Sequence, residues 1–321
     1  MEFEDRLEPE VAALFPAFSA MDLDDIAGAR EEITRRLADA PTRHAESVTR
    51  SDRWIPGAEG DPDVLVRVYR PVAALDSLPC LVWIHGGGFV MGTIDRDDEM
   101  LEHLVTVVGC MAVSIEWRQA PEHPFPASHD DCYAGLKWVC AHADQLGADP
   151  TRIALGGASS GGGSAVGVAL RARDEGTIDL SYLLLVFPML DDRNVTASSR
   201  LITDPRVWNR KSNRLAWDAY LGALAGSDEV PAYAAPARAV DVSDLPPTFV
   251  AVGDLDLFLD EDLEFAARLA ASGVPLELHV YPGAIHGFYS FAPTSRNATA
   301  FAQHRDAALV KAFAPDKVLA G

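Results

Sequence analysis

A serine within a glycine-rich run is the residue of this chain best suited to covalent chemistry. Residues 155–163 read LGGASSGGG, and the pattern G-x-S-x-G is centred on Ser159. The apolar stretch 152–155 precedes the serine, and a small-residue helical stretch, 164–173, follows it. A strand, a sharp turn and a helix in this order are typical of a nucleophile elbow, so the pattern predicts acyl transfer.

The glycine-rich run 155–163 also allows two other interpretations. Ser160 is the rival nucleophile, but Ala158 rather than a glycine stands two residues before it. A glycine-rich run also suits a phosphate-binding loop or a plain tight turn, although the chain contains no G-x-x-x-x-G-K-[ST] pattern. Ser159 therefore stays the favoured nucleophile.

A second glycine cluster, HGGGF at residues 85–89, follows the buried-strand candidate 80–84. Acyl transfer develops negative charge on the carbonyl oxygen, and backbone N–H groups of a loop without side chains can converge on that oxygen. We expect the N–H groups of Gly87, Gly88 and Ser160 to form this oxyanion hole. The rest of the loop includes Gly86 and His85, and His85 is expected to hold the loop in place rather than to transfer a proton.

A serine hydroxyl needs a base to accept its proton, and that base needs a carboxylate to orient it. His286 is favoured because it lies in the loop 282–288, after the strand candidate 276–281 and near the C-terminus. In α/β-hydrolases the triad follows the chain order serine, acid, histidine. His279 is the rival base, but it lies inside the strand candidate.

The orienting acid is expected in the loop that follows the strand candidate 247–252. Four aspartates lie there, and spacing alone does not choose among Asp254, Asp256, Asp260 and Asp262. Asp254 could cap a turn, while Asp260 and Asp262 suit the start of the next helix. Asp256 is left at the tip of the loop.

Alternating strand and helix signals predict an α/β fold. Helical periodicity covers residues 9–40, and the alternation of Val64, Val66 and Val68 predicts a strand over 64–69. Parallel strands with helices on both faces are expected from this order. The further strand candidates are 80–84, 111–115, 152–155, 181–187, 247–252 and 276–281, and the helical stretches are 97–108, 128–145, 160–174 and 260–272.

Residues 191–240 interrupt this alternation. They hold Trp208 and Trp217 among charges and alanines, and they are far longer than an ordinary crossover. We expect an inserted helical lid here. Residues 51–190 and 241–321 then form a single catalytic domain.

Composition narrows the classes of partner. The 321 residues carry a formal charge of −21, from 27 Lys and Arg against 48 Asp and Glu. This balance disfavours nucleic acid, anionic membrane surfaces and anionic substrates. The longest apolar run, 182–190, is too short to span a bilayer. No secretory signal, C-x-x-C pair or metal-demanding histidine spacing is visible, so we expect a cytoplasmic protein.

From about residue 64 to residue 290, several ordered blocks resemble one family, the hormone-sensitive-lipase-like branch of the α/β-hydrolases. The blocks are HGGGF at 85–89, WRQAPE at 117–122 with FPA at 125–127, GASSGG at 157–162, Asp256 to Asp260, and HGF at 286–288. The resemblance implies that the acid is the first aspartate of a D-P-L-x-D-like stretch, which aligns with Asp256. It also implies no metal and no organic cofactor, and a lid in which residues 1–50 join residues 191–240.

The chain departs from the family pattern at three positions. Ala158 stands where the family usually has an acid or a threonine, Trp117 where it often has tyrosine, and Leu257 where it has proline. None of these changes removes a catalytic group, although Ala158 is expected to leave one hydrogen bond near the elbow unmade. We expect Arg118 and Glu122 to lock their loop as an ion pair.

The resulting hypothesis is a serine carboxylesterase that acts on neutral, fairly hydrophobic esters with short or medium acyl chains. Phe89, Trp208 and Trp217 are the candidate pocket residues. A related hydrolase for amides, formamides, lactones or carbamates is the first alternative, and a non-catalytic small-molecule receptor on the same fold is the second. The sequence does not settle the oligomeric state, with a homodimer among the expectations.

Overall fold

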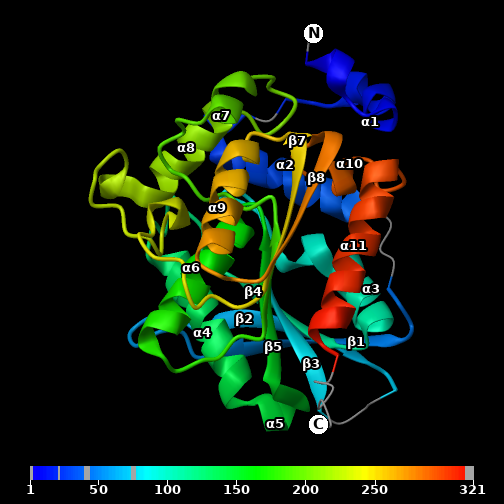
Figure 1. Ribbon diagram of the computed structural model, residues 1–321, viewed down its shortest axis with the longest axis vertical. Helices are drawn as coiled ribbons and strands as arrows, with labels where there is room; N and C mark the ends of the chain where they lie inside the picture. The colour runs from blue at the N-terminus through cyan, green and yellow to red at the C-terminus, as the bar shows by residue number, and fades with distance from the viewer. Residues whose placement is uncertain (1–2, 21, 40–43, 74–76, 315–321) are drawn as a thin grey trace.

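The computed structural model describes residues 3–20, 22–39, 44–73 and 77–314. An eight-stranded sheet lies at its centre, with the order β1-β2-β4-β3-β5-β6-β7-β8 (Figure 1). β2 pairs antiparallel with β1 and with β4, and the other neighbouring pairs are parallel. The strands are β1 (Val48–Ile55), β2 (Val64–Pro71), β3 (Leu78–Ile84), β4 (Met111–Glu116), β5 (Ala148–Ala158), β6 (Tyr182–Val186), β7 (Thr248–Leu255) and β8 (Leu276–Ile285).

The central strands are apolar throughout because both faces of the sheet are covered. In β3 every residue is buried. Leu81 and Trp83 belong to one core cluster, whereas Cys80, Val82 and Ile84 belong to the other. This alternation follows from the two-residue period of a strand, which turns successive side chains to opposite faces.

Each face of the sheet carries its own layer of helices (Figure 1). Leu101 and Phe301 join the first cluster from α3 (Asp98–Val108) and α11 (Arg296–Ala312). The second cluster draws on α4 (Ala127–Ala141), α6 (Ser160–Glu175) and α9 (Leu259–Ala271). The predicted α/β fold, with a mostly parallel sheet between two helical layers, is confirmed.

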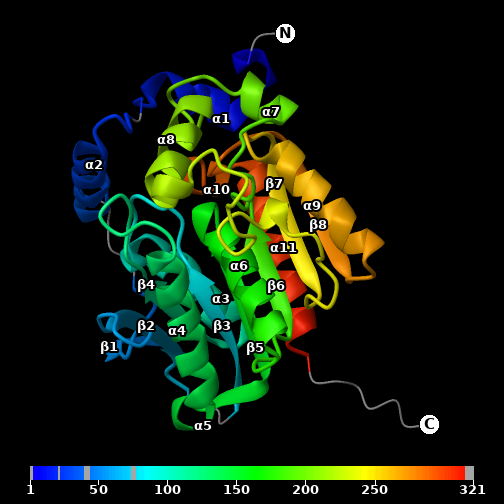
Figure 2. The same ribbon diagram turned by 90° about the vertical axis from the view of Figure 1, so that its left-hand side faces the viewer.

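Four further helices gather at one end of the molecule, beyond the sheet (Figures 1 and 2). They are α1 (Pro9–Leu14) and α2 (Ile26–Asp39) from the N-terminal part, and α7 (Ala197–Leu201) and α8 (Arg210–Leu221) from the inserted part. Arg206 joins the two parts, because its Nη2 lies 2.5 Å from Glu4 Oε1 and its guanidinium lies over the ring of Phe15. The remaining elements are short: α5 (Ala143–Leu146), α10 (Phe288–Phe291), η1 (Glu4–Arg6), η2 (Phe15–Ala17), η3 (Ile94–Asp97), η4 (Gly222–Leu224) and η5 (Pro236–Arg238).

Several boundaries differ from the sequence predictions. The predicted helical stretch 9–40 is divided into α1, η2 and α2, and residue 40 lies outside the described residues. β1 and α11 were not predicted. β1 is an edge strand whose side chains are mostly exposed, so it lacks the apolar alternation that marks a half-buried strand. β8 continues to Ile285, beyond the predicted end at residue 281.

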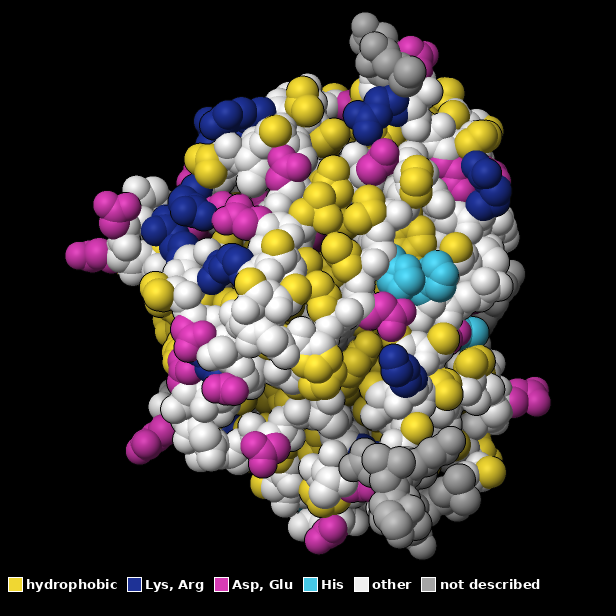
Figure 3. Space-filling view, viewed as in Figure 1, with side chains coloured by type: hydrophobic (Ala, Val, Ile, Leu, Met, Phe, Trp, Pro, Cys, Tyr) yellow, Lys and Arg dark blue, Asp and Glu magenta, His cyan; other side chains and the backbone are white. Residues whose placement is uncertain are grey.

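The surface mixes charge with apolar groups. On the face seen in Figure 3, acidic side chains are scattered among hydrophobic and basic ones. In the described part of the chain, no helix combines the length and the apolar character that a membrane crossing requires.

Candidate active site

Ser159 occupies a strained turn between β5 and α6. Its backbone has φ 57° and ψ −124°, a conformation that side-chain-bearing residues rarely adopt. The turn is tight because α6 packs closely behind β3, and a Cβ at Gly161 would overlap the carbonyl oxygens of Ile84 and His85. This geometry exposes the serine hydroxyl at the carboxyl end of the sheet.

Three side chains form a hydrogen-bonded chain at this point. His286 Nε2 lies 3.0 Å from Ser159 Oγ, and His286 Nδ1 lies 2.8 Å from Asp256 Oδ2. The other carboxylate oxygen of Asp256 accepts the Phe258 N–H at 3.0 Å. Because Asp256 is only 1% exposed, its carboxylate is held rigidly between the imidazole and the loop backbone.

The rival groups from the sequence lie elsewhere. Asp254 accepts the Gly283 N–H at 2.6 Å and pairs with Arg6. Asp260 accepts the Ser198 N–H at 2.7 Å. His279 bonds to Glu277 within β8 and stacks on His304. The geometry therefore joins only Asp256 and His286 to Ser159.

Asp262 lies in the first turn of α9, as predicted, but its side chain does not cap the helix. It lies on the buried face of α9 and is fully buried, and neither carboxyl oxygen has a hydrogen-bond partner among the described residues. Burial raises the pKa of Asp262, and the neighbouring Glu261 and Asp256 raise it further. The same helical spacing that places Phe265 and Leu269 in the core places Asp262 there.

The loop that follows β3 folds back on itself and presents backbone N–H groups to the cavity. Gly87 has φ +145°, and a Cβ there would overlap the Met91 carbonyl oxygen. Its own carbonyl accepts the N–H groups of Val90 and Met91, at 3.2 and 3.1 Å. Among the described residues, no hydrogen-bond acceptor is found for the N–H groups of Gly87 and Gly88. These two donors remain available to a substrate oxygen.

His85 is locked beneath this loop. Its Nδ1 lies 2.9 Å from the Gly86 carbonyl oxygen, and its ring stacks on Trp117 at 4.7 Å between centroids. Burial lowers the pKa of His85 to about 4, which keeps the imidazole neutral and able to donate from Nδ1. This arrangement suits the predicted role of holding the loop.

A cavity of about 630 Å³ opens in front of Ser159 and His286. Trp208 lines it, as predicted, and packs against Gly88. Phe89 and Trp217 do not line it, which differs from the prediction. Phe89 instead stacks on Tyr220 at 3.8 Å behind the loop, and Trp217 is buried beside it. Of the two tryptophans of the inserted part, Trp208 therefore lines the cavity and Trp217 packs in the core.

Several cavity residues were not found from the sequence. Phe187 lines the cavity, has φ +37° and packs edge-on against His286. Phe258 also packs edge-on against His286, but it is fully buried and does not line the cavity. Ala17 and Phe18, together with the first turns of α2, line the side opposite the triad. No sequence motif marks these residues, because distant segments come together there only in the folded chain.

The loop that contains Arg118 and Glu122 is held by ion pairs, but not by the expected one. Arg118 pairs with Asp131 at 2.8 Å and with Asp61 at 2.9 Å. Glu122 pairs with Arg30 of α2 at 2.8 Å. The predicted Arg118–Glu122 pair is therefore wrong. Glu122 instead ties the N-terminal part to the loop.

The described residues contain no group of three or more His, Cys, Asp or Glu side chains arranged to hold a metal ion. The titratable groups that meet at the cavity instead form the linear serine, histidine and aspartate chain.

Comparisons with known proteins agree with this architecture. The family model described as alpha/beta hydrolase fold matches residues 81–290. Carboxylesterase NlhH of Mycobacterium tuberculosis is 36% identical over 293 residues, which cover 89% of each chain. Esterase LipI of the same species is 34% identical over 276 residues, or 84% of this chain and 85% of LipI.

Solved structures extend the comparison to almost the whole chain. A bacterial heroin esterase superposes with a TM-score of 0.93 at 37% identity, over 98% of this chain and 100% of its own. Esterase LipW from Mycobacterium marinum has a TM-score of 0.89 at 35% identity, with 97% and 98% covered. This chain belongs to the α/β-hydrolase family, in the hormone-sensitive-lipase-like branch that the sequence motifs indicated.

Proposed function

We propose that this chain is a carboxylic ester hydrolase that works through an acyl-enzyme formed on Ser159. The observation that carries the proposal is the hydrogen-bonded chain from Ser159 through His286 to Asp256, which opens onto a cavity. The names of the relatives, carboxylesterase and esterase, support the same reaction class. The receptor alternative requires a lost triad member, whereas all three residues are present.

The first half of the reaction forms the acyl-enzyme. Ser159 Oγ attacks the ester carbonyl carbon while His286 Nε2 accepts the serine proton, and Asp256 stabilises the imidazolium. The negative charge that develops on the carbonyl oxygen is held by the N–H groups of Gly87, Gly88 and Ser160. Collapse of this intermediate breaks the bond to the alcohol oxygen, which takes the proton from His286.

The second half releases the acid. Water attacks the acyl carbon of the Ser159 ester, again with His286 as the base, and Ser159 is regenerated when it regains the proton. A cavity of about 630 Å³ falls within the range of small-molecule sites and fits short to medium acyl chains. Trp208 and Phe187 provide apolar contacts beside the triad histidine.

The segments around the cavity are proposed to act as a lid. Residues 1–50 and 191–240 would cover the catalytic core of residues 51–190 and 241–321. Contacts of Arg206 with Glu4 and of Lys211 with Asp24 support a shared unit of the two segments. A homodimer and a cytoplasmic location stay predictions, to be tested by light scattering and by cell fractionation.

Activity of Ser159→Ala on p-nitrophenyl esters tests the proposal. We expect kcat to fall by at least about a thousandfold while the circular dichroism spectrum and melting temperature stay close to those of the wild type. Ser160→Ala is the matched variant, and it should keep most of the activity because only its backbone N–H is used. Near-normal hydrolysis by Ser159→Ala would refute the assignment. Matched ester and amide substrates decide between the two hydrolase classes.

A further inference from the structure

One arginine of the cavity wall, Arg96, forms no direct ion pair with a described residue. Arg35, Arg36, Arg96 and Arg206 all line the cavity that contains Ser159. Arg35 and Arg36 pair with Glu32, and Arg206 pairs with both Asp204 and Glu4. Arg96 is exposed, and its guanidinium makes no hydrogen bond or ion pair with any residue that the structure describes.

The acidic side chains of the same wall are already engaged. Asp25 accepts the Gly28 N–H at 2.9 Å, and Glu32 holds two arginines. Asp97 is buried, and one of its oxygens accepts the Trp83 indole N–H at 2.7 Å. Burial raises the pKa of Asp97 and the charge of Arg96 counteracts this increase, so the two groups interact, but no hydrogen bond joins them. The donor groups of Arg96 are therefore open to a substrate.

The turn that carries Arg96 is fixed on both sides. Arg96 lies in η3, and the side chain of Thr93 caps this turn by accepting the Asp95 N–H at 3.0 Å. The Ile94 N–H donates to Glu116 Oε2 at 2.8 Å. The amide of Gln119 donates to the Gly92 carbonyl at 2.7 Å. The backbone beneath Arg96 thus has little freedom.

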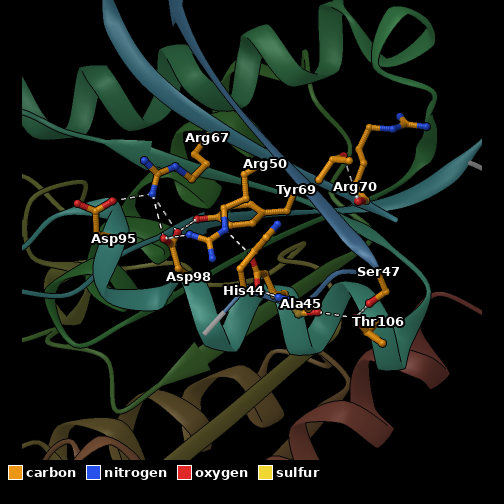
Figure 4. Close-up of polar contacts among 12 residues, drawn as sticks. His44, Ala45, Ser47, Arg50, Arg67, Tyr69, Arg70, Asp95, Asp98 and Thr106 are labelled. Atoms are coloured by element: carbon orange, nitrogen blue, oxygen red, sulfur yellow. Dashed lines mark hydrogen bonds and ion pairs between the residues drawn. The ribbon is translucent and has the colours of Figure 1, made fainter. Parts of the chain in front are cut away.

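Figure 4 shows what holds the outer side of this turn. Arg67 of β2 pairs with Asp95 at 2.6 Å and with Asp98 at 3.0 Å. Asp98 also accepts the Tyr69 hydroxyl at 2.5 Å and pairs with Arg50 of β1. Asp95 and Asp98 are consequently anchored outside the cavity, whereas Arg96 and the buried Asp97 line it.

Arg96 shares its cavity with the reacting groups and acts electrostatically on two neighbouring side chains. Burial lowers the pKa of His85 in the oxyanion loop, and the charge of Arg96 lowers it further. Burial raises the pKa of Tyr289, which lines the same cavity, and Arg96 counteracts this increase. Arg96 lines the same cavity as Gly87 and Gly88 of the oxyanion loop and Tyr289, which follows His286.

We propose that Arg96 is a specificity-determining residue that binds a carboxylate carried by the ester substrate at a distance from the scissile carbonyl. This inference rests on the proposed function and narrows its substrate class. A planar guanidinium binds a carboxylate through two parallel hydrogen bonds, and a preorganised one loses less entropy on binding. The net charge of −21 disfavours anions over the whole surface, but the local charge at Arg96 acts inside the cavity.

The carboxylate can belong to the acyl part or to the alcohol part of the ester, and two substrate pairs separate these sources. The acyl pair is mono-p-nitrophenyl glutarate against p-nitrophenyl pentanoate, which differ by a carboxylate in place of a methyl group. The alcohol pair is para-acetoxybenzoate against para-acetoxybenzamide. For each pair the measured quantity is the ratio of kcat/KM for the anionic ester to that for the neutral ester.

We expect Arg96→Gln to lower this ratio about 10- to 100-fold for at least one pair, the range of a lost charge-assisted hydrogen-bond pair. Arg96→Lys should restore part of the ratio, and added salt should lower it in the wild type. Arg171→Gln is the matched control, because Arg171 is an arginine of α6 that pairs with Asp130 and Glu175 and does not line the cavity, and it should leave both ratios unchanged. Ratios that stay within twofold for both pairs in Arg96→Gln would overturn the proposal.

Binding measured without turnover separates this inference from the proposed function. Calorimetry with mono-p-nitrophenyl glutarate and with para-acetoxybenzoate on the Ser159→Ala variant should give a Kd that weakens about tenfold or more for at least one of the two esters when Arg96→Gln is added. If Ser159→Ala still hydrolyses esters, the proposed function fails, whatever Arg96 does. If Ser159→Ala is inactive and Arg96→Gln does not change the Kd for either anionic ester, the carboxylate site is refuted and the proposed esterase function stands.

Discussion

The two walls of the cavity are built in different ways. The wall with Ser159, His286 and Asp256 is made of buried residues at the ends of strands, and backbone hydrogen bonds fix its groups. The opposite wall comes from residues 17–20 and 22–36 and combines apolar side chains, such as Phe18 and Ile33, with exposed charges that form ion pairs. The side chain of Arg36 is 49% exposed, against 0% for Asp256.

This difference separates chemistry from substrate choice. Proton transfer needs fixed distances, which a sheet core supplies because its strands cannot shift independently. Substrate selection does not need such fixed distances. The residues of the second wall belong to segments that lie outside the sheet. Changes in the first wall should therefore reduce kcat, and changes in the second should act on KM.

The largest expected effect lies in the first wall. Asp256→Asn should lower kcat about 10³- to 10⁴-fold, because the amide favours the wrong tautomer of His286. Asp254→Asn is the matched change two residues earlier, and its bonds go to Gly283 and Arg6 rather than to the histidine. We expect Asp254→Asn to keep kcat within about tenfold. Steady-state kinetics that show equal losses in the two variants would contradict the choice of acid.

A smaller effect is expected where the two walls join. Arg30 of α2 donates to the Val90 and Ala120 carbonyls, each at 2.7 Å, and pairs with Glu122. Arg30→Met should raise KM about three- to tenfold and lower kcat less, because it loosens α2 against the oxyanion loop. Arg36→Gln, which breaks only a pair within α2, should change KM by less than about twofold. A fall in kcat without a rise in KM would place Arg30 in the chemistry instead.

The smallest expected effect concerns stability. Asp262 is buried without a partner, so its folded-state pKa is raised above the unfolded value. A raised pKa means that the wild type keeps its full stability at low pH and loses some as the pH rises through the usual carboxyl range and above. Asp262→Asn should therefore be more stable than the wild type at pH 8, by roughly 1–3 kcal/mol, and the gain should vanish near pH 4.

Urea unfolding at several pH values measures this difference. Glu264→Gln, on the exposed face of the same helix, is the control and should change the free energy of unfolding by less than about 0.5 kcal/mol. A stability gain for Asp262→Asn that is equal at pH 4 and pH 8 would mean that its ionisation does not cause the effect.

The sequence predicted most of the first wall because its signals are local. Gly161 stands two residues after Ser159, and Gly86, Gly87 and Gly88 are consecutive, so each glycine pattern is visible in a short stretch of the chain. The close backbone contacts that require these glycines explain the patterns. Asp256 was less accessible to this reasoning. Four aspartates lie in one short segment, and only the fold shows which of them meets His286.

Almost no sequence pattern indicated the residues of the second wall. Arg30 of the segment 22–36, and Arg96 of η3, which lines the cavity, lie in runs of mixed charge. Whether an arginine is paired depends on partners far along the chain, such as Glu122 for Arg30, 92 residues away, and Glu4 for Arg206, 202 residues away. Phe89 and Trp217 show the converse, since aromatic residues near a site also fill the core. Local patterns thus predict the reacting groups better than the groups that choose the substrate.

The central claim is that Ser159 is the nucleophile, and labelling with a fluorophosphonate followed by peptide mass spectrometry tests it most directly. The account predicts one adduct per chain on the peptide that contains Ser159, with loss of esterase activity in step with labelling and no adduct in Ser159→Ala. Fragmentation that placed the adduct on Ser160, or labelling of Ser159→Ala at the wild-type rate, would contradict it.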